Sequence, residues 1–256
     1  MIRSDDFPGL AARAGSRPVA DPTGALRRVV TTPFPTLEFE KRLWKGGFRY
    51  IAGIDEAGRG AWAGPVCAAA VILPNTPHSA RTARPSARGE ALGGVRDSKQ
   101  MTPLARESWA PRIKEIALAW GVGFASAEEI DTLRIVPATR LAALRAIQSL
   151  TSAHPTPDPP IPDLLFPDYL ITDYLLFPEI PLPQTALVKG DQRSLSVAAA
   201  SVLAKTARDA IMRELDCEYP DYGFARHKGY GTSQHRAAIA QSSLCAIHRK
   251  SFAIKS

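Results

Sequence analysis

The amino-acid sequence predicts an α/β domain in which a mixed β-sheet is flanked by helices. Three observations support this prediction. Short runs of β-forming residues recur along the chain, helical patterns separate the later runs, and acidic residues stand at the ends of several runs. The ends of successive strands then meet at one edge of the sheet, where the sites of α/β proteins usually lie. The fold prediction therefore also predicts the place of a site.

The composition is that of a globular protein with a basic surface. Of the 256 residues 45% are hydrophobic, and Lys plus Arg exceed Asp plus Glu by seven, which gives a pI near 9.5. Such a surface is compatible with nucleic acid or an anionic membrane as a partner. The three cysteines have no CxxC spacing, so neither a zinc site nor a disulfide framework is supported.

Export and membrane signals are missing from the sequence. No apolar run approaches the ~20 residues of a transmembrane helix, and the first 30 residues carry charges throughout and have no apolar signal-peptide core. We therefore expect a cytoplasmic protein with no membrane association.

The chain divides into an extension and a domain. Residues 1–34 are rich in Ala, Arg, Gly and Pro without a clear period, which predicts a flexible N-terminal extension. Residues 35–256 form the predicted domain, and its last part, about 216–256, is a small helical C-terminal region. At the start of the domain, residues 36–45 predict a short helix with Thr36 as its N-cap and Gly46 just past its end.

Two strands and a glycine-rich turn follow this helix. Residues 50–56 and 66–73 predict antiparallel neighbouring strands. The turn between them contains Gly58 and Gly60, and glycine lets a backbone approach a ligand closely because it has no side chain.

The rest of the chain predicts helices, short strands and proline-bearing loops. A helix capped by Thr102 follows an i, i+3, i+4, i+7 apolar pattern to Trp120 and ends at Gly121, and Pro111 should kink or split it. Ser126 and Glu129 form a capping box that opens a helical region interrupted at Pro137. The other predicted elements are strands at 122–125, 169–172 and 185–188, helices at 141–150 and 194–215, a last helix from Thr232 or Ser233, and loops at 74–94 and 151–167.

Four carboxylates stand at predicted strand ends. Asp55 and Glu56 end the first strand, Asp173 follows the strand at 169–172, and Asp191 lies in the Lys-Gly-Asp turn after 185–188. Taken singly, Asp173 and Asp191 fit ordinary turn positions. Gathered together, the four acids would repel one another unless cations bind or some acids stay protonated. Such hard oxygen ligands suit Mg²⁺ or Mn²⁺, and a two-metal site for phosphodiester hydrolysis needs this set.

The motifs, in their order and approximate spacing, resemble those of ribonuclease HII from about residue 36 to the C-terminus. The sequence reads GIDEAGRG at 53–60, DSK at 97–99, Asp at 173, KGD at 189–191, AAAS at 198–201, AK at 204–205, RD at 208–209, and YGFARHKGYGT at 222–232. The resemblance implies a ribonuclease H-like fold. It also implies an endonuclease that hydrolyses the RNA strand of RNA–DNA hybrids and cuts 5′ of single ribonucleotides in duplex DNA. The products would carry 3′-hydroxyl and 5′-phosphate ends, and the role would be ribonucleotide removal in DNA replication and repair.

The same resemblance implies the residues of the site. The expected catalytic and metal-binding residues, which would hold two Mg²⁺ or Mn²⁺ ions during catalysis, are Asp55, Glu56, Asp173 and Asp191. The expected substrate-binding residues are Gly58, Arg59, Gly60, Ser98, Lys99, Lys189 and Tyr230. The expected partners are RNA–DNA hybrid and ribonucleotide-containing duplex DNA, bound by a monomer. Further basic residues that could grip phosphates, although each alone fits a solvated surface, are Arg193, Lys205, Arg226, His227 and Lys228.

Several features limit or compete with this interpretation. Trp62 is bulkier than the residues usual after the glycine turn, which leaves the shape of that loop open. The sister family, ribonuclease HIII, would need a separate N-terminal substrate-binding domain, and residues 1–34 are too short and polar for one. A DNA resolvase or integrase would also use an acidic cluster, but has no need of the glycine turn. A non-catalytic nucleic-acid-binding module would not need all four acids.

His235, His248 and Arg208 are polar residues for which the sequence favours a structural role over a catalytic one. We expect His235 and His248 at the surface or behind the site, since neither has metal-ligand spacing. Arg208 lies inside the long helix next to an aspartate, and we expect a structural pair or an exposed face there.

Overall fold

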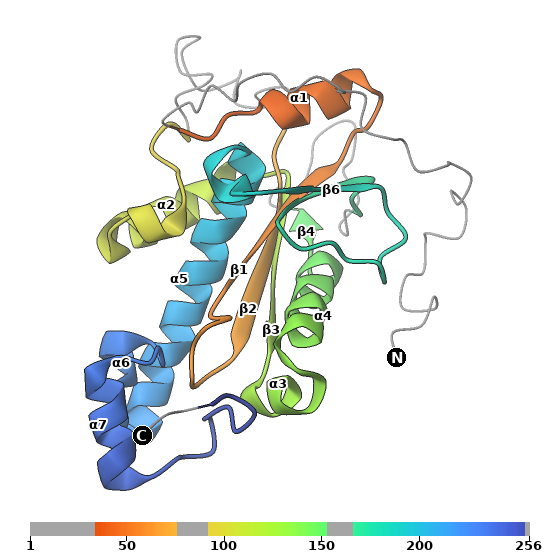
Figure 1. Ribbon diagram of the computed structural model, residues 1–256. Helices are drawn as coiled ribbons and strands as arrows, with labels where there is room; N and C mark the ends of the chain where they lie inside the picture. The colour runs from red at the N-terminus through yellow and green to blue at the C-terminus, as the bar shows by residue number, and fades with distance from the viewer. Residues whose placement is uncertain (1–33, 76–91, 153–165, 254–256) are drawn as a thin grey trace.

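A six-stranded mixed sheet forms the centre of the computed structural model, which describes residues 34–75, 92–152 and 166–253. The strand order is β4-β3-β2-β1-β5-β6 (Figure 1). The pairs β4–β3, β3–β2 and β2–β1 are antiparallel, whereas β1–β5 and β5–β6 are parallel. The strands are β1 (Ile51–Ala57), β2 (Val66–Ile72), β3 (Ala119–Ala125), β4 (Thr151–Ser152), β5 (Tyr169–Asp173) and β6 (Gln184–Leu187). The predicted α/β class with a mixed sheet is confirmed.

Helices cover both faces of this sheet. α2 (Pro103–Ile116) and α5 (Leu195–Glu218) pack on one face, and α4 (Ile135–Gln148) packs on the other. Every residue of β2 is buried because both its faces are covered. The remaining helices are α1 (Glu38–Lys45), α3 (Ala127–Leu133), α6 (Phe224–His227), α7 (Ser233–Ser242) and the 3₁₀ turns η4 (Ser98–Gln100), η5 (Gly190–Gln192) and η6 (Pro220–Tyr222). None of the helices among the described residues is long and apolar enough to cross a membrane.

The N-terminus of α5 is fixed by a buried acid from α1. The Glu40 carboxylate accepts hydrogen bonds from the hydroxyls of Ser194 and Ser196, both at 2.6 Å, and from the Ser196 main-chain N–H at 3.0 Å. A negative charge at a helix N-terminus is favourable because the first N–H groups have no partner within the helix. Glu40 therefore ties the beginning of the domain to its longest helix.

The end of α5 and the residues after it form a separate lobe. The C-terminal lobe, residues 216–253, contains α6 and α7 and lies below the sheet in Figure 1. Its apolar centre includes Tyr222, Phe224 and Ile239, which pack with Met212 of α5 and with Ala63 from the turn after β1. Residues next to β1 are thereby part of the lobe's own core.

Several predicted boundaries are wrong, because strand pairing overrides local pattern. Trp120 and Gly121 belong to β3 and pair with Val71 and Ala70 of β2, although helical spacing assigned them to the preceding helix. β1 extends one residue beyond its predicted end at Glu56, because Ala57 pairs with Cys67 of β2. The acids at 55 and 56 lie within this strand, as predicted.

Helix ends show smaller differences. The N-cap of α1 is Leu37, not Thr36. α2 begins after Thr102 as predicted, but continues through Pro111 without splitting. The helical break near Pro137 falls at Arg134, where φ is 71°, and Pro137 lies in the first turn of α4, where a missing N–H costs nothing.

Deleting residues 1–33 is expected to leave folding and catalysis unchanged. Those residues lie outside the described part of the chain, as do 76–91 and 153–165 of the two predicted loops. The sequence of 1–33 has no periodic apolar residues, whereas the Phe34 ring lies 5.1 Å from the Arg96 guanidinium. A chain that begins at Phe34 should melt within about 2 °C of the full chain. Thermal unfolding and cleavage of a short duplex test this, and failure to fold would place the domain boundary further upstream.

Candidate active site

The sheet brings the predicted acids together from three segments. Asp55 lies in β1, and its neighbour Ile54 pairs with Thr172 of the adjacent parallel strand β5. Asp173 is the last residue of β5, so it lies at the same level as Asp55. Its Oδ1 accepts a hydrogen bond from the Gly190 main-chain N–H at 2.7 Å. That bond fixes η5, which carries Asp191, beside the end of β5.

The acids interact electrostatically because they are close and withdrawn from water. Burial raises the pKa of Asp55 well above its usual range, and the charges of Glu56, Asp173 and Asp191 raise it further. Burial likewise raises the pKa of Glu56, against the lowering effect of the Arg59 guanidinium. The pKa of Asp191 rises to about 7, first through burial and then through neighbouring carboxylates. The positive charges near the cluster therefore do not compensate the negative charges of its carboxylates.

A fifth acid belongs to this cluster, and the sequence analysis missed it. Asp97 is buried, and its carboxylate raises the pKa of Asp191. It caps η4 by accepting the Lys99 main-chain N–H at 2.9 Å. The DSK motif contained it, but only Ser98 and Lys99 were selected as site residues. Burial works to lower the pKa of Lys99, and the surrounding carboxylates outweigh this effect and raise it.

The donor set fits a hard divalent cation. Carboxylate oxygens from β1, β5 and η5 are the ligands that Mg²⁺ and Mn²⁺ prefer, and a cation would relieve the repulsion that raises their pKa values. Among the described residues, no three His, Cys, Asp or Glu side chains are already arranged as ligands of one ion. Within β1 successive side chains point to opposite faces, so Asp55 and Glu56 leave the strand in different directions.

The glycine turn after β1 has one glycine packed against a side chain, Gly58, and one glycine with free space beside it, Gly60. Gly58 has φ of 94°, and a Cβ there would lie 2.0 Å from Arg208 Nε, so only glycine fits. A Cβ at Gly60 would meet nothing within 4 Å. The Arg59 guanidinium lies 3.2 Å from the Glu56 carboxylate. The turn is thus joined to an acid of the cluster and leaves its backbone at Gly60 open.

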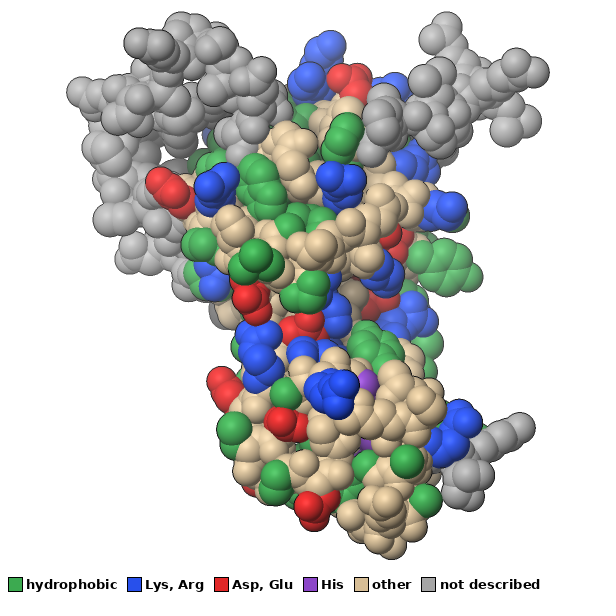
Figure 2. Space-filling model, turned by 90° about the vertical axis from the view of Figure 1, so that its left-hand side faces the viewer, with side chains coloured by type: hydrophobic (Ala, Val, Ile, Leu, Met, Phe, Trp, Pro, Cys, Tyr) green, Lys and Arg blue, Asp and Glu red, His purple; other side chains and the backbone are tan. Residues whose placement is uncertain are grey.

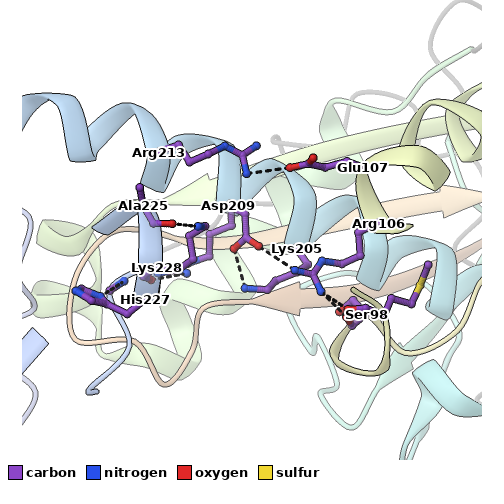
Figure 3. A network of polar contacts seen from close by, with 12 residues as sticks. Ser98, Arg106, Glu107, Lys205, Asp209, Arg213, Ala225, His227 and Lys228 are labelled. Carbon is purple, nitrogen blue, oxygen red and sulfur yellow. Dashed lines mark hydrogen bonds and ion pairs between the residues drawn. The ribbon is translucent and has the colours of Figure 1, made fainter. Parts of the chain in front are cut away.

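A network of buried charges supports the segment that contains Ser98 (Figure 3). The Arg106 guanidinium donates to the carbonyls of Ser98 and Met101 at 2.9 and 2.7 Å, and to Asp209 at 3.2 Å. The Ser98 N–H donates to the Ser201 hydroxyl at 3.1 Å. Asp209 therefore pairs with Arg106 and not with its sequence neighbour Arg208. The structural role expected for this aspartate is retained with a different partner.

Tyr230 lies between α6 and α7, at the edge of the C-terminal lobe. Its ring is partly exposed and lies 5.3 Å from the Arg208 guanidinium and 5.4 Å from Lys205 Nζ. The main-chain N–H of Trp62 donates to the Gly229 carbonyl at 2.8 Å, so the residues after the glycine turn contact the Tyr230 loop directly. The bulky Trp62 ring is accommodated beside His235, with ring centroids 5.7 Å apart.

The basic residues named from the sequence are distributed unevenly. Lys99 and Lys189 are exposed beside the acidic cluster, whereas His227 is buried and its Nε2 lies 2.8 Å from the Tyr222 carbonyl. Figure 2 shows Lys, Arg and acidic side chains gathered where the sheet domain narrows towards the C-terminal lobe.

His235 and His248 are buried, so of the two positions expected for them, at the surface or behind the site, the surface is excluded. Their exposed fractions are 0% and 1%, and their Nε2 atoms are 3.0 Å apart. The carbonyl of Tyr230 can only accept, so His235 donates to it from Nδ1 at 3.1 Å. The N–H of Cys245 can only donate, so His248 accepts at Nδ1 at 3.0 Å. These tautomers make His248 the donor to His235.

This histidine pair is expected to make stability fall at acidic pH. Burial lowers the pKa of His235 to about 4, and it also lowers the pKa of His248. In the unfolded chain both titrate near 6.5. Between about pH 6.5 and 4 the unfolded state binds more protons than the folded state. The contribution of the pair to the free energy of unfolding is therefore complete above this window, decreases as the pH falls through it, and is absent below it. The slope is at most about 1.4 kcal/mol per pH unit for each group.

Thermal unfolding of the wild type and of His235→Asn between pH 7.5 and 4.5 measures this contribution. Asparagine retains an amide donor for the Tyr230 carbonyl but does not titrate. The carboxylates are common to both proteins, so the wild type should lose more stability on acidification. Equal slopes would show that the pair is not the source of the loss.

Comparisons with known proteins identify relatives over most of the chain. The sequence profile of the family described as Ribonuclease HII matches residues 52–255. A ribonuclease HII from Syntrophotalea carbinolica is 47% identical over 216 residues, covering 84% of this chain and 91% of that protein. One from Synechococcus sp. is 45% identical over 235 residues, covering 92% and 94%.

Solved structures give the same result for the fold. The ribonuclease H2 of Pyrococcus horikoshii matches with a TM-score of 0.60 at 22% identity, covering 80% of this chain and 94% of that one. A ribonuclease HII of Archaeoglobus fulgidus, determined in complex with PCNA, matches at 0.57 and 25% identity, covering 78% and 92%. A ribonuclease HIII determined with Mn²⁺ matches at 0.58 and 19% identity, covering 80% and 68%.

Proposed function

The chain belongs to the ribonuclease HII family, and we propose that the acidic cluster of β1, β5 and η5 is its catalytic centre. Membership makes it a metal-dependent endoribonuclease that acts on RNA–DNA hybrids and on ribonucleotides embedded in DNA, and its sheet is that of a ribonuclease H-like fold. The observation that supports the location is the convergence of Asp55, Asp173 and Asp191 with raised pKa values at Asp55 and Asp191.

In this proposal Asp55, Glu56, Asp173 and Asp191 hold two Mg²⁺ or Mn²⁺ ions. Two divalent ions held by these residues would activate a water molecule for attack and would neutralise charge on the leaving oxygen. The Gly190 N–H holds the Asp173 carboxylate in place through its bond of 2.7 Å. Lys99, which faces these carboxylates, offsets part of their charge when no substrate is bound. Asp97 fixes the Lys99 backbone and so the position of that ammonium group.

The glycine turn reads the ribose in this proposal. RNA differs from DNA by a 2′-hydroxyl that can donate and accept hydrogen bonds. The open backbone at Gly60 can approach this group closely, and it lies four residues from Glu56. Recognition and hydrolysis would then share one short segment, with cleavage on the 5′ side of the ribonucleotide and 3′-hydroxyl and 5′-phosphate ends. That reaction would remove ribonucleotides left in DNA by replication.

A cleavage assay on three matched duplexes tests the proposed function. The substrates are an all-DNA duplex, the same duplex with one ribonucleotide, and an RNA–DNA hybrid of the same sequence, each with Mg²⁺ or Mn²⁺. The all-DNA duplex should remain intact, and the single ribonucleotide should be cut on its 5′ side. Cleavage of all-DNA duplex would favour a resolvase-like activity, and a 2′,3′-cyclic phosphate product would exclude the two-metal mechanism.

A further inference from the structure

Arg208 is a buried side chain whose charge the proposed reaction does not use. It has 0% exposure on α5, and burial lowers its pKa. A buried guanidinium is costly unless its N–H groups find partners. No carboxylate of the described residues lies within ion-pair distance of it. Its partners are main-chain carbonyls, and they come from two loops far apart in the sequence.

The three donor nitrogens of Arg208 connect these two loops. Nε donates to the Pro65 carbonyl at 2.8 Å and Nη2 to that of Ala63 at 3.1 Å, both just after the glycine turn. Nη1 donates to the Lys228 carbonyl at 2.9 Å, at the start of the Tyr230 loop. The guanidinium also lies 5.3 Å from the centroid of the Tyr230 ring, a distance at which a cation attracts an aromatic face.

The same side chain sets the place of the glycine turn itself. Arg208 Nε occupies the space where a Cβ of residue 58 would be. One guanidinium thus contacts the turn at Gly58, the segment 63–65 and the Tyr230 loop. A lysine could not replace it, because an ammonium group has no rigid fork with three separate donor directions.

We propose that Arg208 is a positioning residue for substrate discrimination, which sets the distance between the glycine turn and Tyr230. This inference rests on the proposed function, in which the glycine turn reads the ribose. Tyr230, an expected substrate-binding residue, would then contact the neighbouring sugar. A junction substrate needs both readers at a fixed separation, whereas a continuous hybrid offers a ribose at every position of the RNA strand. Loss of Arg208 therefore impairs cleavage at a single embedded ribonucleotide more than cleavage of a hybrid.

Arg208→Lys and Arg249→Lys form a matched pair that tests this role. Arg249 is equally buried, but its side-chain hydrogen bonds go to the carbonyls of Gly64 and Arg59, in the turn and the segment after it, and among the described residues none is formed with the Tyr230 loop. For Arg208→Lys, kcat/KM on the single-ribonucleotide duplex should fall about 100-fold, through kcat, and the hybrid value should fall less than about fivefold. Arg249→Lys should lower both values by similar factors.

The double variant with Arg208→Lys and Tyr230→Ala should favour the hybrid over the single-ribonucleotide duplex no more strongly than Tyr230→Ala alone. Both substitutions remove the same recognition of the sugar, so their effects on this preference should not add. Equal losses from Arg208→Lys on both substrates, while Tyr230→Ala loses only junction cleavage, would make Arg208 a structural residue and overturn the inference. If Tyr230→Ala itself loses both activities equally, the proposed role of Tyr230 fails, and hydrogen exchange then decides the role of Arg208.

Amide hydrogen exchange tests the coupling of the two loops without activity. In Arg208→Lys, exchange in segments 58–65 and 228–232 should accelerate together, and the strands should be unaffected. Acceleration in only one segment, or throughout the chain, would contradict the coupling. If Arg208→Lys does not fold, native-state exchange of the wild type in low denaturant replaces it. The amides of Trp62 and Tyr230 should then open with the same denaturant dependence, and separate openings would overturn the inference.

Discussion

Asp55→Asn is expected to abolish most cleavage while the protein stays folded. The substitution removes a charged oxygen ligand from the centre of the acidic cluster but keeps the shape of the side chain. Its oxygen can still accept the Glu56 main-chain N–H, which Asp55 Oδ1 accepts at 2.7 Å. Loss of several kcal/mol of transition-state stabilisation corresponds to a fall in kcat of about 1000-fold. Single-turnover cleavage at saturating Mg²⁺ measures it.

Glu56→Gln and Asp173→Asn should have comparable effects, whereas Asp191→Asn should lose less, because we expect it to act more on metal occupancy. Without metal, Asp55→Asn should melt at the same temperature as the wild type or higher, because a buried charge and its repulsion from Asp173 are removed. Asp221→Asn, a change at an exposed aspartate outside the cluster, is the control and should cleave normally. Wild-type rates for Asp55→Asn would exclude Asp55 as a metal ligand.

Tyr230→Ala is expected to impair cleavage of the single-ribonucleotide duplex much more than cleavage of an RNA–DNA hybrid. We expect the aromatic face of Tyr230 to stack on the deoxyribose next to the ribonucleotide, where a 2′-hydroxyl would be crowded. Removing the ring should lower kcat/KM on the single-ribonucleotide duplex about 10- to 100-fold, the factor that corresponds to aromatic stacking. The loss on a long RNA–DNA hybrid should be much smaller.

Tyr230→Phe is the matched variant for this experiment. It retains the ring, so it should keep the preference for the junction if stacking carries the discrimination. A loss with Tyr230→Phe as large as with alanine would assign the discrimination to the phenol hydroxyl. Equal losses of Tyr230→Ala on both substrates would reduce Tyr230 to general binding or packing, since Lys205 and Arg208 already lie near its ring.

The sequence predicted the parts of the fold that depend on local chemistry. Thr102 caps α2, and Ser126 and Glu129 form the capping box of α3. Each of these signals acts within three or four residues, so it can be recognised without knowledge of distant partners. The succession of strands along the chain followed from the same local patterns. So did the positions of Asp55, Asp173 and Asp191 near strand ends.

Boundaries within the sheet were less predictable, because they depend on pairing. Trp120 continues a helical pattern from α2, yet seven backbone pairs with β2 place it in β3. Ala57 lay outside the predicted strand, yet its pairing with Cys67 extends β1 by one residue. Backbone hydrogen bonds between distant segments outweigh the weak preferences of single residues.

The sequence by itself determined the family motifs, the helix caps at Thr102 and Ser126 and the four acids of the proposed site. Only the tertiary structure decided which polar groups join or support that site. Asp97 reaches Asp191 across 94 positions of the sequence, and Arg208 reaches the Ala63 carbonyl across 145. His235 and His248 are hidden because the C-terminal lobe closes over them. Buried polar groups must find partners wherever the fold provides them, and those partners are set by packing between segments that no local pattern connects.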